Sequence, residues 1–251
     1  METIKPEASE QGLDRSALSP WAGLALALLA ASVTYVGIRA VHPIYRVGKE
    51  FDVPSIGMPT ELFLANRREQ DKVERKHAMI YVGGLGLLIA LALGAGEAAA
   101  RRFWLAPLLA APLGVLGGAI GGLLGSLVNV YVRTNIGQPE LNHTIGTQLA
   151  LGIPLGLGVG LGVGLATRSL TGTLKSAFAG LAAGALAAAL YPVLISIVLP
   201  AASTDSLLPD ETSSRVLWLA VFAALLGAII PVASRGRKAP MTQSPPVTSP
   251  P

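Results

Sequence analysis

The side chains best suited to chemistry gather between residues 129 and 148, where polar groups separate two glycine-rich apolar segments. Amides, hydroxyls and an imidazole at this spacing can line a pore mouth or hold a small ligand between close-packed helices. The alternative, which we favour, is structural: polar side chains at helix ends hydrogen-bond to one another and tie the helices together. The candidate polar site consists of Asn129, Arg133, His143, Thr147 and Gln148.

One carboxylate, Glu97, falls within an otherwise apolar segment. A charge inside hydrocarbon is costly, so one that is kept often marks an ion path, a proton relay or catalysis. Arg101 and Arg102 follow Glu97 closely, which indicates a position near the membrane surface. The prediction is an interfacial acid paired with arginine, and a functional role is the alternative.

No set of residues forms a recognisable catalytic constellation. Cysteine is absent, which removes disulfides, thiolate metal sites and cysteine nucleophiles together. His42, His77 and His143 are scattered, and no zinc-binding or phosphate-loop motif occurs. Residues 94–99 match a loose dinucleotide fingerprint but end an apolar run without a βαβ context. We predict a protein that is not an enzyme and uses no cofactor and no metal.

The composition is that of a membrane protein. Hydrophobic residues make up 51% of the chain and charged residues only 14%, whereas soluble proteins carry about 25% charged residues. The mean hydropathy is +0.56. The net charge of +4 is interpreted as an orientation signal and as lipid headgroup contact, not as a nucleic-acid footprint. The expected partners are the lipid bilayer and a second copy or other membrane proteins, with no nucleic acid.

The apolar segments predict an all-α, polytopic integral membrane helix bundle with about six transmembrane helices. The third segment, residues 103–132, would span about 45 Å as one helix, against a hydrocarbon core of about 30 Å. It must therefore tilt, kink at a proline or fold back as a re-entrant hairpin. The predicted order is a disordered tail at 1–19, a membrane helix at 20–41, a charged and partly helical extramembrane loop at 42–77, a glycine-rich membrane bundle at 78–234 with helices at 78–98, 103–132, 144–167, 174–200 and 215–234, and a disordered Pro- and Ser-rich tail at 235–251.

Glycine recurs every four residues in the middle of the chain. Such rows let helix backbones approach closely, which matters because lipid offers helices little hydrophobic reason to associate. The two rows of the third segment lie about 60° apart and should merge into one broad stripe, whereas those of the fourth lie on nearly opposite sides. We predict packing within the chain, with subunit association or a pore wall as alternatives. The rows are Gly114, Gly118 and Gly122 beside Gly117, Gly121 and Gly125, then Gly152, Gly156, Gly160 and Gly164 opposite Gly158 and Gly162, and finally Gly180 and Gly184.

Lysine and arginine in the short connections set the expected orientation. Six crossings put Arg101, Arg102 and Arg168 on the side of both termini, which would then be cytoplasmic. The first loop disagrees, because it carries seven Lys and Arg, although six acids nearly balance them. A hairpin within residues 103–132 would instead place the first loop inside with the C-terminus and would move Arg101 and Arg102 outside. We favour six crossings and a multi-pass location, in the inner or plasma membrane if the source is bacterial.

Two functions remain open at this stage. The first is a non-catalytic membrane component that acts through helix–helix association, indicated by the glycine rows, the charged first loop and the nearly charge-free membrane interior. The alternative is a channel or permease for a small or uncharged solute, indicated by the polar cluster and by the possible hairpin.

Overall fold

The computed structural model describes residues 18–41, 43–45, 60–135, 141–200, 207–209 and 211–235. Within these ranges all regular structure is helical, and six helices are long and apolar enough to cross a membrane, which confirms the predicted bundle. The expected tails, apart from their innermost residues, and residues 46–59 of the first loop lie outside the described ranges. The helices are α1 Pro20–Val41, α2 Thr60–Arg101, α3 Ala106–Asn135, α4 Leu141–Leu165, α5 Leu170–Val198 and α6 Thr212–Ser234.

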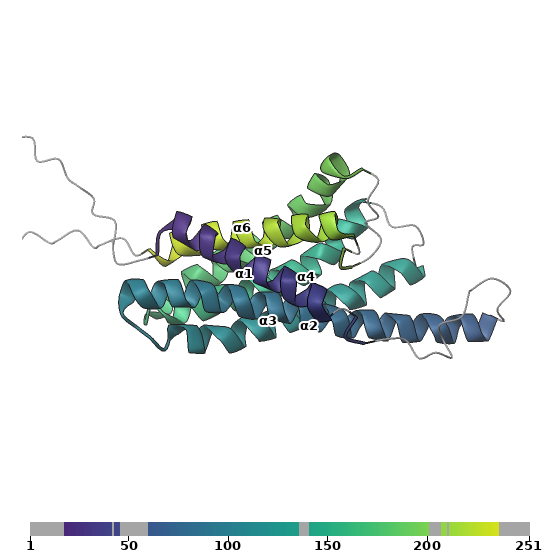
Figure 1. Cartoon of the computed structure of the whole chain (residues 1–251), viewed down its shortest axis with the longest axis horizontal. Coiled ribbons are helices and arrows are strands. Elements are labelled where there is room, and N and C mark those ends of the chain that lie inside the picture. Colours follow the sequence, from purple (N-terminus) through teal and green to yellow (C-terminus); the bar gives the residue numbers. More distant parts are fainter. Residues whose placement is uncertain are drawn as a thin grey trace, which may run out of the picture.

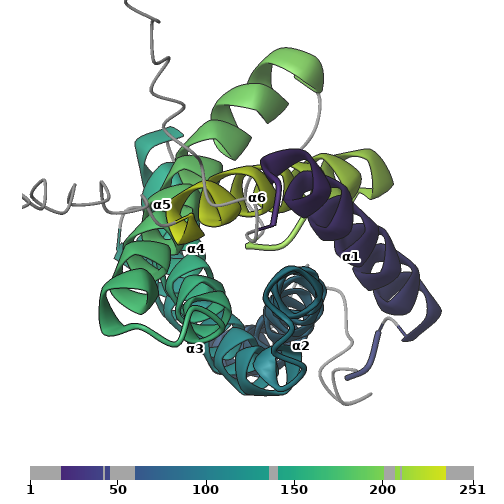
Figure 2. The ribbon, with the colours of Figure 1, turned by 90° about the vertical axis from the view of Figure 1, so that its left-hand side faces the viewer.

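The six helices close into a ring. Each helix packs against the next one in the chain, and α1 contacts both α6 and α2, so that the first and last helices complete the circle (Figure 2). The start of α1 and the end of α6 lie at the same end of the bundle (Figure 1). That end also holds the turns from α2 to α3 and from α4 to α5. The chain therefore crosses six times, and α3 is one continuous helix, which rules out the re-entrant hairpin.

The helix ends differ from the apolar segments for identifiable reasons. α3 begins at Ala106 and not at Phe103, because Arg102 adopts a left-handed conformation (φ 55°) that ends α2. The N–H of Phe103 then donates to the carbonyl of Ala98 at 3.1 Å, closing the helix end. At the other end of the bundle, α3 and α4 continue into polar residues, because backbone hydrogen bonding does not stop where the hydrocarbon stops.

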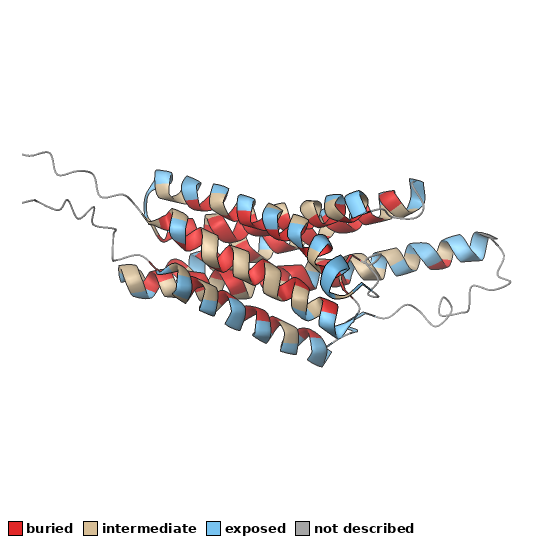
Figure 3. Ribbon diagram, turned by 90° about the horizontal axis from the view of Figure 1, so that it is seen from above, coloured by how far each residue is buried: buried red, intermediate tan, exposed pale blue. Residues whose placement is uncertain are grey.

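Aliphatic and aromatic side chains fill the centre of the ring. Leu85 and Leu93 of α2, Leu155 of α4, and Phe222 and Leu226 of α6 have no exposed surface. In the ribbon coloured by burial, buried residues gather on the sides of the helices that face the bundle, and exposed residues gather on the outer sides (Figure 3). The middle of the bundle is thus an apolar core, and dispersion contacts between these side chains hold it.

The glycine rows of α3 face two different neighbours. A methyl group added to Gly122 would lie 2.5 Å from the carbonyl oxygen of Ala78 in α2, and one added to Gly117 would lie 2.5 Å from that of Pro154 in α4. The two rows therefore do not act as the single broad stripe expected from the sequence, because 60° is enough to direct them at separate helices. Gly114, Gly118 and Gly122 face α2, and Gly117, Gly121 and Gly125 face α4.

α4 lies between α3 and α5 and contacts each through a glycine row. A methyl group on Gly158 would lie 2.5 Å from the carbonyl oxygen of Leu113, and one on Gly152 would lie 2.5 Å from that of Gly184. Here the two rows are directed to opposite sides of the helix. The row that faces α5 is Gly152, Gly156, Gly160 and Gly164, the row that faces α3 is Gly158 and Gly162, and Gly180 and Gly184 of α5 face α4 in return.

α2 is the longest helix and leaves the bundle. Its 42 residues span about 63 Å, roughly twice the hydrocarbon thickness. The residues expected to form a helix after Thr60 are continuous with the membrane part, and they project beyond the other helices (Figure 1). We call residues 60–77 the α2 extension.

We expect the close approach of α2 and α3 to be needed for stability. A methyl group on Gly86 would lie 2.9 Å from the carbonyl carbon of Gly114, so Gly86→Val should lower the free energy of unfolding by about 1–3 kcal/mol through overpacking. Gly84→Val is the matched control, because a methyl group there meets nothing within 4 Å, and its effect should stay within about 0.5 kcal/mol. Denaturant titration of the purified protein in detergent, followed by tryptophan fluorescence, measures both. Equal losses in the two variants would contradict the packing described here.

Candidate functional site

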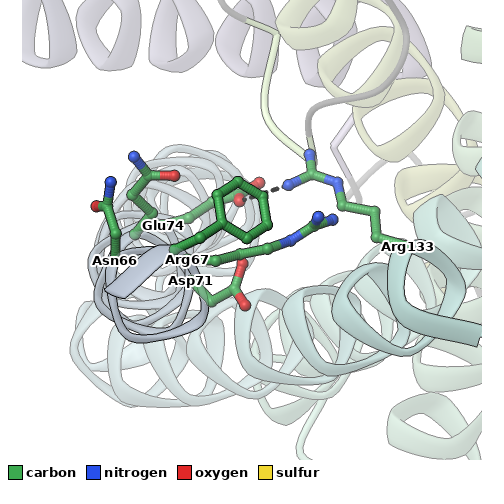
Figure 4. A pocket seen from close by; sticks show the side chains of 7 residues that line it. Asn66, Arg67, Asp71, Glu74 and Arg133 are labelled. Carbon is green, nitrogen blue, oxygen red and sulfur yellow. Dashed lines mark hydrogen bonds and ion pairs between the residues drawn. The ribbon is translucent and has the colours of Figure 1, made fainter. Parts of the chain in front are cut away.

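Glu74 is the centre of a polar network at the end of the bundle from which α2 projects. One of its oxygens accepts hydrogen bonds from Asn129 Nδ2 and from the N–H of Leu207, both at 3.3 Å. The other accepts from Arg133 Nη1 at 3.2 Å, an ion pair that is about one-quarter exposed on each side (Figure 4). Glu74 thus joins α2 to α3 and to the segment that precedes α6.

The position of Glu74 on its helix explains why it meets α3. Ala78 and Val82 follow at four-residue intervals, and the backbone of both lies against glycines of α3. Residues four apart share one face of a helix, so Glu74 extends the α3-facing row by one turn beyond the apolar part. Its carboxylate therefore reaches the polar end of α3.

The network continues into the core through Gln148 of α4. Gln148 Nε2 donates to the carbonyl of Leu207 at 3.0 Å, and Trp218 Nε1 of α6 donates to Gln148 Oε1 at 3.1 Å. Both side chains are only 2% exposed. A buried amide or indole N–H without a partner is costly, and here each has one. The whole network links α2, α3, α4 and α6 at one level of the bundle.

The structure brings some of the sequence-predicted polar residues together and leaves others apart. Asn129, Arg133 and Gln148 belong to the network. Thr147 is buried beside it, with its carbonyl oxygen near Gly125 of α3. His143 is partly buried in the first turn of α4, and the network described above does not pass through it.

Three members of the network were missed in the sequence. Glu74 lies in the predicted charged loop at 42–77 and was not singled out as a site residue, although its four-residue spacing from Ala78 is a usable signal. Trp218 offered a weaker signal, since a tryptophan within an apolar helix needs an acceptor for its indole N–H. Leu207 contributes only backbone groups, so its residue type gives no sequence signal for that role.

A cavity of about 320 Å³ opens beside the Glu74–Arg133 pair, between the α2 extension and the end of α3 (Figure 4). Its charged side chains are two acids and two arginines, so the cavity has no net formal charge. Among the described residues no group of three or more His, Asp or Glu could hold a metal ion. The arrangement suits a polar or zwitterionic protein surface. The cavity is lined by Phe63, Asn66, Arg67, Gln70, Asp71, Glu74 and Arg133.

Glu97 lies at the opposite end of the bundle and is fully buried. Arg101 Nε donates to one of its oxygens at 2.7 Å, and Ser234 Oγ donates to the other at 2.6 Å. Arg101 also donates to the carbonyl of Ser234 at 2.8 Å. Both oxygens of the acid are thus occupied, and the triad fastens the end of α2 to the end of α6. Of the two arginines considered as partners, the structure pairs Glu97 with Arg101.

These features define the class of the protein. Six apolar helices with polar networks at the two ends of an apolar core make it a multi-pass helical membrane protein. Comparison with known proteins adds no narrower assignment: no family model, no curated protein and no solved structure matches this chain. The function must therefore be argued from the geometry alone.

The Gln148 amide should contribute measurably to stability. Gln148→Leu leaves the indole N–H of Trp218 and the carbonyl of Leu207 buried without their partner, which should lower the free energy of unfolding by about 1–3 kcal/mol. Gln70→Leu is the control, since Gln70 is exposed and the chemical change is the same. Thermal unfolding in detergent compares the two variants. If the Gln148→Leu protein is as stable as the control, the hydrogen bonds of Gln148 do not contribute measurably to stability.

Proposed function

We propose that this chain is a non-catalytic membrane component that acts by associating with another membrane protein through the α2 extension. One observation carries the proposal: α2 continues as a single helix of 42 residues and leaves the bundle with large apolar side chains uncovered. A helix in water owes most of its stability to packing of an apolar face. A partner would therefore bind to the extension and cover its exposed apolar side chains.

The apolar side chains gather at the tip of the extension. Leu62, Phe63 and Leu64 are between 39% and 49% exposed. They lie in the first two turns of α2, at the end that projects from the bundle. Consecutive residues of a helix point about 100° apart, so these three side chains surround the tip and do not form one face. A groove that encloses the tip can cover all three. This arrangement supports a protein surface as the partner.

The charges of the extension support the same class of partner. Acidic and basic residues alternate along it, from Glu61 through Arg67, Arg68 and Glu69 to Lys76. Nucleic acid and anionic lipid attract surfaces of one sign. A mixed surface instead offers paired contacts to a protein with the complementary pattern, which gives specificity and register.

The Glu74 network supports the role of the extension by fixing the direction in which it leaves the bundle. Glu74 is held by α3 and by the segment before α6, at the level where α2 emerges. The extension is thus continuous with a helix anchored on two sides. A surface presented rigidly loses less entropy when it binds than a flexible one.

The alternative, a channel or permease for a small or uncharged solute, rests on the cavity beside Arg133. Its weakness is the core: Leu85, Leu155 and Phe222 fill the centre of the ring and have no exposed surface. A solute path through the ring would have to displace them. Ser234 donates its hydroxyl proton to the carboxylate of Glu97, but both residues are buried and neither lines a cavity described here, so the proposal remains non-catalytic.

Site-specific photo-crosslinking in the native membrane tests the association. A photoreactive residue at Leu64 should give one discrete adduct, whereas the same residue at Thr134, exposed at the end of α3, should give none. An adduct of twice the chain mass identifies a second copy, and any other mass identifies a different protein. Leu62→Ser should reduce the Leu64 adduct severalfold. Failure to trap any protein from Leu64, or equal trapping from Thr134, contradicts the proposal.

Flux measurements test the alternative. Proteoliposomes that contain the purified chain should shrink and recover in a glycerol or urea gradient at the rate of protein-free vesicles, because the apolar core closes the ring. Stopped-flow light scattering gives this rate. If the proteoliposomes recover faster than protein-free vesicles, and Arg133→Leu changes that rate, the channel is favoured over the association.

A further inference from the structure

A second cavity, of about 460 Å³, lies at the end of the bundle opposite the α2 extension. It is formed where the turn from α2 to α3 meets the turn from α4 to α5. The proposed association does not use it. The side chains that matter here are Arg101, Arg102, Phe103, Thr167 and Arg168.

The cavity is strongly basic. Three arginines line it, and no acidic residue does. Arg101 is paired with the buried Glu97, so its charge is compensated. Among the described residues, Arg102 and Arg168 form no ion pair, and both are exposed. Two positive charges therefore remain in one cavity without a counter-charge.

The backbone at these two arginines is unusual. Arg102 has φ 55° and Arg168 has φ 53°, and no other non-glycine residue among those described has a positive φ. Each follows the end of a helix, where glycine adopts this conformation most easily. The chain contains 29 glycines and uses them freely elsewhere. The two positions thus carry cations on a backbone that glycine would adopt at lower cost.

The helix dipole accounts for only part of this choice. A cation near a helix C-terminus is stabilised, and Arg168 is the first basic residue after α4, whose last turn contains none. Arg101 already supplies such a cation inside the last turn of α2, so Arg102 is not needed for that purpose. The additional feature of Arg102 and Arg168 is their shared direction, since both line the same cavity. An anion bound between the two side chains would explain why both line this cavity, whereas the helix dipole does not explain it.

Arg168 is held in place by an aromatic ring. Its guanidinium carbon lies 3.9 Å from the centre of the Phe103 ring, a cation–π distance. A stacked guanidinium keeps its N–H groups free at the edge of the plane, where they can donate to phosphate oxygens in pairs. Thr167, whose hydroxyl donates to the carbonyl of Gly164 at 2.8 Å, also lines the cavity.

The location indicates where the anion comes from. The cavity sits at the ends of α2 and α4, where the apolar parts of these helices end and lipid headgroups are expected. Trp104, next to it, is 76% exposed, and tryptophan is enriched at this interface. We propose that Arg102 and Arg168 bind the phosphate ester of an anionic phospholipid headgroup in this cavity. Basic pockets between membrane helices bind such headgroups.

Lipid binding to the full-length protein in detergent tests the proposal. Native mass spectrometry should show retention of phosphatidylglycerol at least tenfold tighter than of phosphatidylcholine, whose choline cation meets the two arginines. Glycerophosphoglycerol, the deacylated and soluble form of the same phosphodiester headgroup, should bind weakly and should not displace the lipid. If the soluble ester binds as tightly as the lipid, the headgroup assignment is wrong.

Glycine variants separate the site from the fold. Arg102→Gly with Arg168→Gly suits the left-handed backbone, so the lipid-free melting temperature should be unchanged or higher. Phosphatidylglycerol binding should nevertheless weaken at least tenfold. The control is Arg39→Gly with Arg68→Gly, which removes the same charge at the opposite end of the bundle and should change binding less than twofold. Unchanged binding in the first pair, or equal loss in the control pair, overturns the proposal.

Discussion

The close approach of helix backbones across glycine is the constraint on which the rest of the structure depends. Within lipid, helices gain little by hiding apolar surface, so contact must come from dispersion between closely packed backbones. α3 and α4 each bear glycine rows directed at two neighbours, and together they align α2 through α5 as one continuous packed layer. α6 and α1 then close the ring. Side chains with charge are left for the two ends, where water and headgroups can solvate them.

The number of membrane helices and their order could be predicted from hydropathy, since each apolar segment became one helix. The neighbouring helices that the two glycine rows of α3 face could not be predicted in this way. Gly117 and Gly118 are adjacent in the chain, and only the positions of α2 and α4 decide that they contact different helices.

The candidate polar site was predicted in part. Asn129 and Gln148 end or begin apolar segments and are conspicuous, whereas Glu74 is one acid among several in a charged run, and the sequence alone does not say which of them faces inward.

The two ends of the bundle have different electrostatic characters. At one end, acids and arginines are balanced, and Glu74 and Arg133 neutralise each other between α2 and α3. At the other, Glu97 neutralises Arg101 and leaves Arg102 and Arg168 uncompensated. A balanced end suits a protein partner, which supplies charges of both signs, and a basic end suits the anionic face of a bilayer. The orientation that puts the basic end in the cytoplasm rests on these same arginines and stays a prediction.

The closure of the ring by its first and last helices has a consequence for biosynthesis. Gly23 of α1 packs against the backbone of Gly227 in α6, so α1 meets this neighbour only after the rest of the chain has been translated. The contacts from α2 to α5, in contrast, join consecutive hairpins and can form as each pair enters the bilayer. Until α6 enters the membrane, α1 therefore has only α2 as a packing partner. During that interval the face of α1 that later contacts α6 is exposed to lipid.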